Sequence, residues 1–238
     1  MEYDENETDP LGEIPNFCPI CGTSSIFETH GVSQRFRVKC PNCSSVERIR
    51  FQYLIFEKRF FSKFEKPCKL LHFAPEQAFY EIFMSFENID YYPVDLNPSY
   101  FERRGRHIVK KVNMEDIPYD DKEFDFIFNS HVLEHVPNYL KAMSELYRVL
   151  KDDGTCIVAV PIYEIPETFE KEEYNTPELR LKYYGQEDHL RKYGLDFKDL
   201  LESVGFNVEV IKTQDIIDNY FEQKLISINR QYLFICTK

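Results

Sequence analysis

The sequence lacks any apolar run that approaches the roughly 20 residues of a membrane-spanning helix. Its opening stretch, MEYDENETDP, is acidic, whereas a signal peptide is basic and then apolar. We therefore expect no membrane span and a cytoplasmic location. The sequence also lacks an excess of positive charge, because its formal net charge is -12. Such a surface repels a phosphate backbone, which argues against a nucleic-acid partner.

Positive charge is nevertheless concentrated in one segment of the chain. Between Gly31 and Leu70 there are ten lysine and arginine residues against three acidic residues. For a run of this kind we expect a solvated face around a small module.

Four of the seven cysteines form two C-x-x-C pairs, Cys18 with Cys21 and Cys40 with Cys43, separated by 18 residues. This spacing is typical of a structural zinc site. Zinc in such a site takes four thiolates in a tetrahedron and keeps no open position, so we expect a zinc ion with a structural role. In the cytoplasm disulfides are rare, and we interpret the remaining Cys68, Cys156 and Cys236 as core thiols.

The residues around these cysteines predict a zinc ribbon at the amino-terminal end. Residues 33–39 alternate as a hairpin strand does, and residues 44–61 read as a helix rich in phenylalanine. We expect that helix to dock the ribbon onto the main domain. The predicted organisation is a disordered acidic segment over residues 1–15, a ribbon with its docking helix over residues 16–66, and a main domain over residues 67–238.

From residue 67 onward, short apolar strands alternate with amphipathic helices. This order predicts an α/β fold with a mostly parallel seven-stranded sheet and helices on both of its faces. The expected strands are KLLHF, YYPVDL, VKKVN, EFDFIFNS, TCIVAVP, VEVI and YLFICT, and the expected helices lie in EQAFYEIFMSF, in residues 140–150 before a turn at KDDG, and in DFKDLLESVGF.

The string HVLEH, residues 131–135, matches a zinc-protease signature, H-x-x-E-H. A protease of that kind needs its histidines in the middle of a long helix. Here the string follows a buried strand directly and Pro137 comes two residues later. It therefore lies at the carboxyl end of a sheet strand, where open α/β sheets bind ligands.

With these residues in place, the chain from about Lys69 to Lys238 resembles class I S-adenosylmethionine-dependent methyltransferases, which have a Rossmann-like fold. The most specific stretch is DIPYDDKEFDFIFNSHVLEHVPNYLKAMSELYRVLKDDGTCIVAVP. More narrowly, the ribbon together with LLHFAPE, SHVLEHVP and GQEDHLRKYG resembles bacterial-type methyltransferases associated with sugar and surface-glycan modification. The resemblance implies S-adenosylmethionine as cofactor.

The family's cofactor-binding positions carry over to the ends of three predicted strands. Asp95, followed by Leu96, stands where the family places the acid that accepts hydrogen bonds from the ribose hydroxyls, a task that suits a carboxylate. Asn113 and Met114 stand where the family holds adenine, and Asn129 and Ser130 stand near the methionine part of the cofactor.

The first cofactor loop departs from the family pattern. Where the family has an acid followed by G-x-G, this chain has His72, Phe73, Ala74, Pro75 and Glu76. Glycine allows positive φ and close backbone approach, and Ala-Pro restricts both. Either the loop takes another path around the cofactor or the site has decayed. In the first case, which the resemblance favours, Glu76 meets the methionine ammonium.

Five residues are candidates for the chemistry of methyl transfer, in which the protein positions the acceptor and removes its proton. His131, Glu134 and His135 lie at the end of the fourth strand of the domain. Asp188 and His189 follow a long acidic insertion, about residues 162–194, that we interpret as a lid over the site. For His189 a helix-entry role that only bonds backbone is an equal alternative.

Two roles remain open for HVLEH. In many methyltransferases the Glu-His of this motif orients the loop through backbone hydrogen bonds. Alternatively, two imidazoles and a carboxylate can hold a divalent metal, and this ligand set favours a softer ion than magnesium. Retained activity in chelator, with the ribbon zinc still bound, would remove the second role.

The function expected from these features is O-methylation of a sugar, a nucleotide-linked sugar or a glycan-related small molecule, with a sugar or phosphorylated metabolite as the acceptor. One alternative is an RNA methyltransferase, since some of these also carry a zinc ribbon. A second alternative is an inactive methyltransferase-like scaffold that binds a partner protein. Steep salt dependence of binding would favour the first, and absence of cofactor binding would favour the second.

Overall fold

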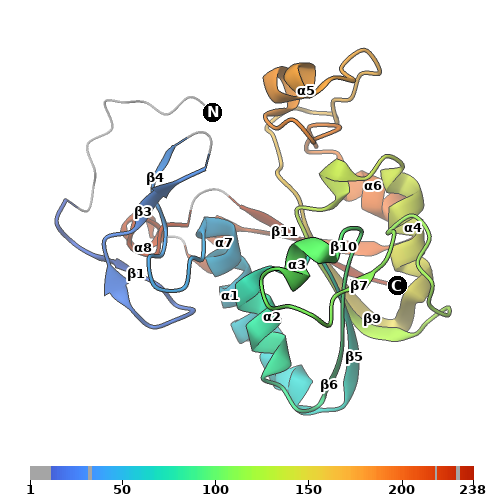
Figure 1. Cartoon of the computed structure of the whole chain (residues 1–238), viewed down its shortest axis with the longest axis horizontal. Helices are drawn as coiled ribbons and strands as arrows, with labels where there is room; N and C mark the ends of the chain where they lie inside the picture. Colours follow the sequence, from blue (N-terminus) through green and yellow to red (C-terminus); the bar gives the residue numbers. More distant parts are fainter. Residues whose placement is uncertain (1–11, 32–33, 218, 229–230) are drawn as a thin grey trace. The chain divides into compact units, whose positions relative to one another are not determined.

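The computed structural model describes residues 12–31, 34–217, 219–228 and 231–238 (Figure 1). Most of the predicted acidic segment, residues 1–11, lies outside the described residues. The chain divides into two compact units. One comprises the chain up to Lys63 together with Lys212–Gln231, and the other comprises Phe64–Ile211 and Tyr232–Lys238. The sequence predicts one domain over residues 67–238, whereas the structure groups Lys212–Gln231 with the amino-terminal unit.

The smaller unit holds the cysteine pairs and two short antiparallel hairpins. Strand β1 (Asn16–Phe17) pairs with β2 (Ser24–Ser25), and β3 (Glu28–His30) pairs with β4 (Arg35–Lys39). The predicted helix is present as α1 (Glu47–Arg59), and two short helices, α7 (Thr213–Ile216) and α8 (Tyr220–Leu225), complete the unit. A 3-10 turn, η1 (Phe61–Glu65), follows α1.

The buried guanidinium of Arg50 explains why the late segment belongs to this unit. Arg50 donates to the carbonyl oxygens of Val38 and Ser45 near the cysteines and to those of Ile226 and Ser227 far along the chain. Its side chain is fully buried. A single side chain from α1 thus ties the residues near the cysteines to Ile226 and Ser227, which lie 176 and 177 positions after Arg50.

The larger unit is built on a seven-stranded sheet, as the sequence predicts. The strand order is β10-β11-β9-β8-β5-β6-β7. Pairing is parallel among β5 to β9, and β11 runs antiparallel to β9. The bounds are β5 Cys68–Phe73, β6 Ile89–Asp95, β7 Lys110–Lys111, β8 Phe124–Ser130, β9 Leu150–Ala159, β10 Asn207–Lys212 and β11 Tyr232–Thr237.

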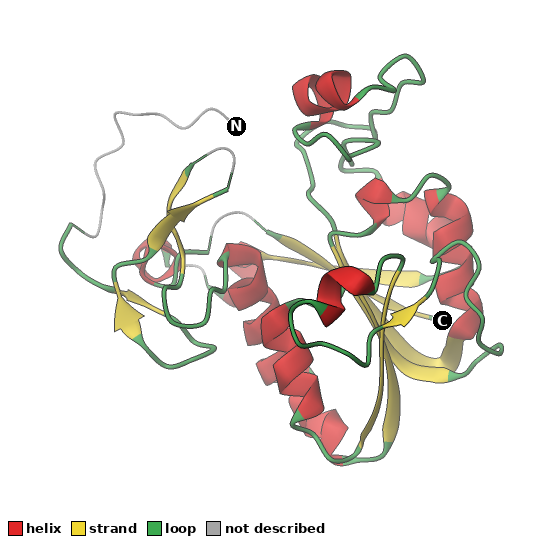
Figure 2. Ribbon diagram, in the orientation of Figure 1, coloured by secondary structure: helices red, strands yellow, loops and turns green. Residues whose placement is uncertain are grey.

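Helices cover both faces of this sheet (Figure 2). On one face α2 (Gln77–Met84) packs Phe79 and Phe83 against Phe128 of β8. On the other face α4 (Tyr139–Val149) and α6 (Phe197–Ser203) bury their apolar side chains in the main core. Helix α3 (Ser99–Glu102) follows β6, and a 3-10 turn, η2 (Leu133–His135), follows β8.

Local details differ from the sequence-based expectation at three places. The KDDG turn is absorbed into β9, whose register against β8 shifts there. Leu140 stands at helical spacing from Met143, which predicts it on the buried face of α4, but it is 40% exposed, because Ala142, Met143, Leu146 and Val149 form that face. The predicted lid contains a helix, α5 (Pro177–Tyr184), that its weak periodicity did not indicate. In the part of the chain that the structure describes, no helix has the length and apolarity to cross a membrane.

Candidate active site

A cavity of about 710 Å³ opens at the carboxyl ends of β5, β6, β7 and β8. Small-molecule sites occupy roughly 300–1,000 Å³, and in open α/β sheets they lie at this edge. Its walls come from the loops that follow four neighbouring strands and from the lid. The lining residues are Phe73, Ala74, Asp95, Leu96, Asn97, Tyr100, Phe101, Val112, Asn113, Met114, Glu115, His131, Val132, His135, Val136, Pro137 and Asp188.

The cavity brings together about half of the sequence-predicted site residues. The predicted residues that line it are Ala74, Asp95, Leu96, Asn113, Met114, His131, His135 and Asp188. The predicted residues that do not line it are His72, Pro75, Glu76, Asn129, Ser130, Glu134 and His189. Several residues of the second group lie directly behind the first and hold it in position.

Asp95, the last residue of β6, has the geometry expected of a ribose ligand. One of its carboxylate oxygens, Oδ1, accepts the backbone N–H of Asn97 at 2.7 Å, which fixes the carboxylate at the cavity wall. Burial raises the pKa of Asp95 above its usual value, and the hydrogen bond from Asn97 opposes this only in part. A carboxylate held in this way can accept hydrogen bonds from a diol through its second oxygen. The cavity volume and this carboxylate fit an adenosyl group.

The first loop reaches a glycine-like conformation without glycine. Ala74 has φ +47°, in the left-handed region, and its N–H donates to the carbonyl of Val94 at 2.9 Å. Pro75 is buried, and its carbonyl accepts a hydrogen bond from the guanidinium of Arg106. The loop therefore follows a turn that Ala-Pro was expected to hinder, and Ala74 faces the cavity.

His72 points away from the cavity, into the other face of the sheet. Its ring is fully buried and stacks on Phe128, and its Nδ1 lies 2.8 Å from the hydroxyl of Tyr91. Burial, with the nearby charge of Arg106, lowers the pKa of His72 to about 3. His72 is thus a neutral core residue beneath the loop and has no contact with the cavity.

Glu76 and Ser130 connect the first loop to the end of β8. The Ser130 hydroxyl donates to Glu76 Oε1 at 3.1 Å, and Ser130 and Asn129 are both buried. These residues, predicted to meet the methionine part of the cofactor, lie next to one another behind the cavity wall.

The HVLEH segment forms a sharp turn and then the short turn η2. His131 has φ +56°, and its N–H donates to the carbonyl of Ala159 at 2.8 Å. His131 Nδ1 lies 3.2 Å from Oε1 of Glu134, whose side chain is fully buried. Burial alone would raise the pKa of Glu134, but the hydrogen bond from His131 and the charges of His131 and His135 outweigh it and lower that pKa. The long helix that a metalloprotease requires is not present at this motif.

The lid inserts two predicted residues beside this turn. His135 Nδ1 lies 3.2 Å from the carbonyl oxygen of Asp188 and 3.4 Å from its carboxylate. The ring of His189 packs edge-on against that of His135 at 4.8 Å between centroids. His189 is only 3% exposed, and burial lowers its pKa, which favours the neutral imidazole.

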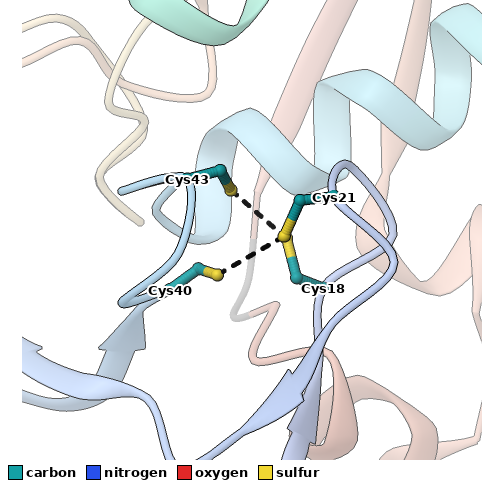
Figure 3. Close-up of side chains that lie close together, drawn as sticks. All are labelled: Cys18, Cys21, Cys40 and Cys43. Carbon is teal, nitrogen blue, oxygen red and sulfur yellow. Dashed lines mark hydrogen bonds between the residues drawn. The ribbon is translucent and has the colours of Figure 1, made fainter.

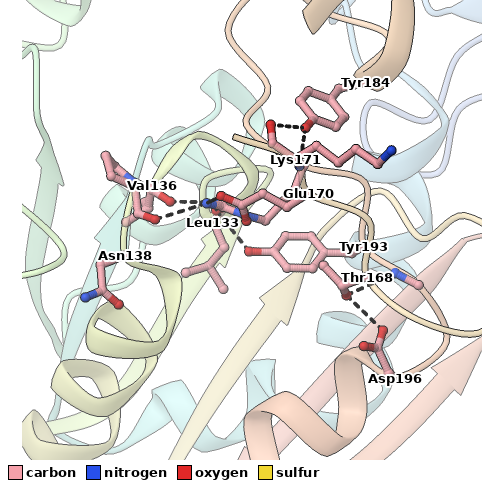
Figure 4. Close-up of polar contacts among 12 residues, drawn as sticks. Leu133, Val136, Asn138, Thr168, Glu170, Lys171, Tyr184, Tyr193 and Asp196 are labelled. Atoms are coloured by element: carbon pink, nitrogen blue, oxygen red, sulfur yellow. Dashed lines mark hydrogen bonds and ion pairs between the residues drawn. The ribbon is translucent and has the colours of Figure 1, made fainter. Parts of the chain in front are cut away.

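A residue that sequence reasoning did not single out, Arg191, fastens the lid to the turn. Its fully buried guanidinium donates to the carbonyl oxygens of Leu133, Val136 and Pro137, and it pairs with Glu170 at 2.6 Å. The hydroxyl of Tyr193 donates to Leu133 as well, at 3.0 Å (Figure 4). Arg191 lies within the quoted GQEDHLRKYG, yet nothing in that string distinguishes a buried arginine from a solvated one.

The four cysteines of the smaller unit face a common centre (Figure 3). Cys18 Sγ lies 3.6 Å from Cys43 Sγ, and Cys21 Sγ lies 3.7 Å from Cys40 Sγ. Four thiolates at the usual Zn–S distance of about 2.3 Å form a tetrahedron with edges of about 3.8 Å. Arg50, buried among carbonyl oxygens, supplies positive charge beside them. The donor set and its spacing fit structural zinc.

Comparisons with known proteins agree with this architecture. Residues 75–158 match the family described as "Methyltransferase domain". The uncharacterized protein MJ0638 of Methanocaldococcus jannaschii is 40% identical over 84 residues, which are 35% of this chain and 36% of that protein. A demethylmenaquinone methyltransferase of Staphylococcus carnosus is 40% identical over 42 residues, 18% of this chain and 17% of the enzyme. This chain thus spans about a third of the first relative's length and less of the second's.

A solved structure matches over most of the chain. The crystal structure of an S-adenosylmethionine-dependent methyltransferase from Archaeoglobus fulgidus aligns with a TM-score of 0.54 and 18% identity, over 79% of this chain and 93% of that one. At this identity the match concerns the fold alone. Together these findings give a bounded assignment: residues 75–158 match a methyltransferase domain, and the larger unit has the Rossmann-like fold of S-adenosylmethionine-dependent methyltransferases.

Proposed function

We propose that this domain transfers a methyl group to a hydroxyl of a neutral sugar or glycan-related small molecule. The observation that carries the proposal is the composition of the cavity. It combines Asp95, at the position for the ribose, with two imidazoles, those of His131 and His135. A hydroxyl must lose its proton as it is methylated, and imidazole is the side chain best suited to accept it near neutral pH.

S-adenosylmethionine, when bound, supplies a methyl group activated by a sulfonium. His131 is the group that we assign to the proton. Its Nδ1 faces the buried carboxylate of Glu134 at 3.2 Å, which leaves Nε2 for the acceptor. As the acceptor oxygen forms its bond to the methyl carbon and the carbon–sulfur bond breaks in line, the hydroxyl proton passes to His131. Glu134 orients the imidazole and stabilises its charged form.

The charge of the cavity supports a neutral acceptor. Asp95, Glu115 and Asp188 contribute three acidic side chains to the lining, and the lining contains no lysine or arginine. Phosphate groups are bound by cationic side chains or by exposed backbone N–H groups. A nucleotide-linked sugar, a phosphorylated metabolite or RNA would therefore meet unfavourable charge at this wall.

The first experiment is a calorimetric titration with S-adenosylhomocysteine, whose adenosyl part engages the Asp95 position. We expect one-to-one binding by the parent protein. Asp95→Asn should bind at least about tenfold more weakly, because a charge-assisted hydrogen bond contributes about 1.5–3 kcal/mol. Asp90→Asn, on the same strand but exposed and outside the cavity, is the matched control and should bind as the parent does.

Acceptor screening then tests the chemistry. His131→Asn should lose turnover with neutral sugar acceptors while it keeps its affinity for S-adenosylhomocysteine. No binding of S-adenosylhomocysteine by the folded, zinc-loaded parent would contradict the proposal and favour an inactive scaffold. Turnover confined to RNA, with binding that weakens steeply as salt rises, would contradict the acceptor class.

A further inference from the structure

Three side chains from two distant segments converge behind the cavity wall. Glu134 and His135 come from the turn η2, and His189 comes from the lid. One carboxylate oxygen and one nitrogen from each imidazole lie within 4.8 Å of one another. Of the three, only His135 also lines the cavity, so the cluster adjoins the cavity through this residue.

Each of these side chains has a coordinating atom still available. Nδ1 of His189 is buried and has no hydrogen-bond partner, while the same ring is hydrogen-bonded to the backbone of Tyr184. Nδ1 of His135 faces Asp188, which leaves Nε2. The Glu134 carboxylate faces His131 with Oε1, which leaves Oε2.

Side chains that bind a metal usually make hydrogen bonds of this kind with the atoms that do not contact the metal. A histidine that binds a metal through one nitrogen usually donates the other N–H to a backbone carbonyl or a carboxylate, which fixes the ring. His189 and His135 both have such a partner, Tyr184 for one and Asp188 for the other. A fully buried carboxylate with an uncommitted oxygen is costly unless a cation meets it.

We propose that Glu134, His135 and His189 bind a divalent transition-metal ion, of which Zn²⁺ is the best match. Two imidazoles and one carboxylate form a three-ligand set that keeps a position open, in contrast to the closed four-cysteine site. The HVLEH string alone suggested His131 as the third ligand, but the folded chain supplies His189 instead and leaves His131 for the acceptor proton.

The proposed ion has a role in the reaction, and this part of the inference rests on the proposed function. Because His135 lines the cavity, an open position on its side of the ion would face the place where the acceptor is expected. A divalent cation there lowers the pKa of an acceptor hydroxyl that it contacts. The hydroxyl proton then passes more readily to His131. Metal binding itself requires neither cofactor nor acceptor.

Cobalt serves as the probe, because it reports the ligand type by its visible absorption. Protein that retains zinc at its four cysteines is titrated with Co²⁺. We expect one further equivalent to bind, with visible bands but without thiolate charge-transfer bands, and Zn²⁺ to displace it. Glu134→Gln and His189→Ala should lower the affinity at least about 100-fold, since even outer partners of metal ligands contribute 10–100-fold. His107→Ala, an exposed histidine outside the cluster, should bind like the parent.

The outcomes separate the alternatives. If the parent binds no further Co²⁺, or if the ligand variants bind it unchanged, the cluster is only a hydrogen-bonded network and the inference is overturned. Glu134 and His189 are buried, so His135→Ala, at a half-buried position, provides a second test with less effect on folding. Titration with S-adenosylhomocysteine in the same samples keeps the two proposals apart, because cofactor binding without metal binding would overturn only this one.

Discussion

Replacement of the buried His72 by phenylalanine should make the free energy of unfolding less dependent on pH, by an amount that can be calculated. The folded protein holds the pKa of His72 at about 3, whereas the unfolded chain has a histidine pKa of about 6.5. As the pH falls through 6.5, the unfolded state takes up a proton that the folded state does not. Stability contributed by the neutral ring is therefore complete above pH 6.5 and is lost progressively toward pH 3.

The size of the effect follows from the two pKa values. Between pH 7 and pH 5 the linkage amounts to about 2 kcal/mol for this single group, because each pH unit below 6.5 contributes about 1.4 kcal/mol. Phenylalanine fits the aromatic surroundings formed by Phe83 and Phe128. Loss of the contact with Tyr91 lowers the stability of the variant by a similar amount at every pH, so it cancels from the comparison.

The assay is urea unfolding at pH 7 and at pH 5 for the parent, His72→Phe and His107→Ala. The loss of stability between the two pH values should be about 2 kcal/mol smaller in His72→Phe than in the parent. His107→Ala, at an exposed position, is the control for the removal of a histidine as such. Equal losses in the parent and His72→Phe would refute a neutral buried His72. The variant should also bind S-adenosylhomocysteine as the parent does, since His72 does not line the cavity.

Three further substitutions test the loops and the ribbon. Ala74→Gly should raise the midpoint of thermal unfolding, because relief of a positive φ outweighs the greater freedom of glycine by up to about 1 kcal/mol, whereas Ala74→Val should lower it. Arg191→Met should reduce the free energy of unfolding by about 3 kcal/mol, as three carbonyl oxygens lose their donor, and an unchanged urea midpoint would contradict that role. Arg50→Met should speed the release of zinc to a chromogenic chelator, and equal release rates would show that its charge does not support the thiolates.

The strands and the edge of the sheet at which the cavity opens could be predicted because they depend on local pattern. Apolar runs of strand length, alternating with amphipathic helices, indicate the parallel sheet. The topology then indicates that the loops after the parallel strands lie together at the carboxyl edge of the sheet, where ligands bind. The position of Asp95 at the cavity wall follows in this way, because Asp95 ends β6 and therefore lies at that edge.

The position of His72 could not be read from its place near the loop, although the strand period contained the information. Side chains alternate between faces along a strand, and Leu71 and Phe73 both enter the core under α4 and α6. His72 therefore faces α2, with Leu70. The family motif placed His72 in the cofactor loop because its neighbours in the sequence belong to that loop. The alternation of side chains along β5 instead turns His72 to the opposite face of the sheet.

The pairing of Glu134 with His189 lay beyond sequence reasoning for a different reason. The two residues are far apart in the chain, and the lid between them has little regular structure outside α5. Its path is set by single tertiary contacts, such as the Leu190 N–H donating to the Glu134 carbonyl at 2.9 Å and the Arg191 bonds to the turn. Periodicity carries no signal for contacts of this type.

At the same edge of the sheet, two residues other than glycine adopt a conformation that glycine usually provides. Ala74 after β5 and His131 after β8 both adopt a left-handed conformation, and each donates its N–H to the neighbouring strand. For non-glycine residues this geometry costs about 1–2 kcal/mol. Both strained residues, Ala74 and His131, have side chains that face the cavity. At position 131 glycine would remove the backbone strain, but it would also remove the imidazole. The strain at His131 is therefore the cost of placing an imidazole at this point of the cavity. At position 74 only a methyl group is at stake, which is why the stabilising substitution is expected there and not at His131.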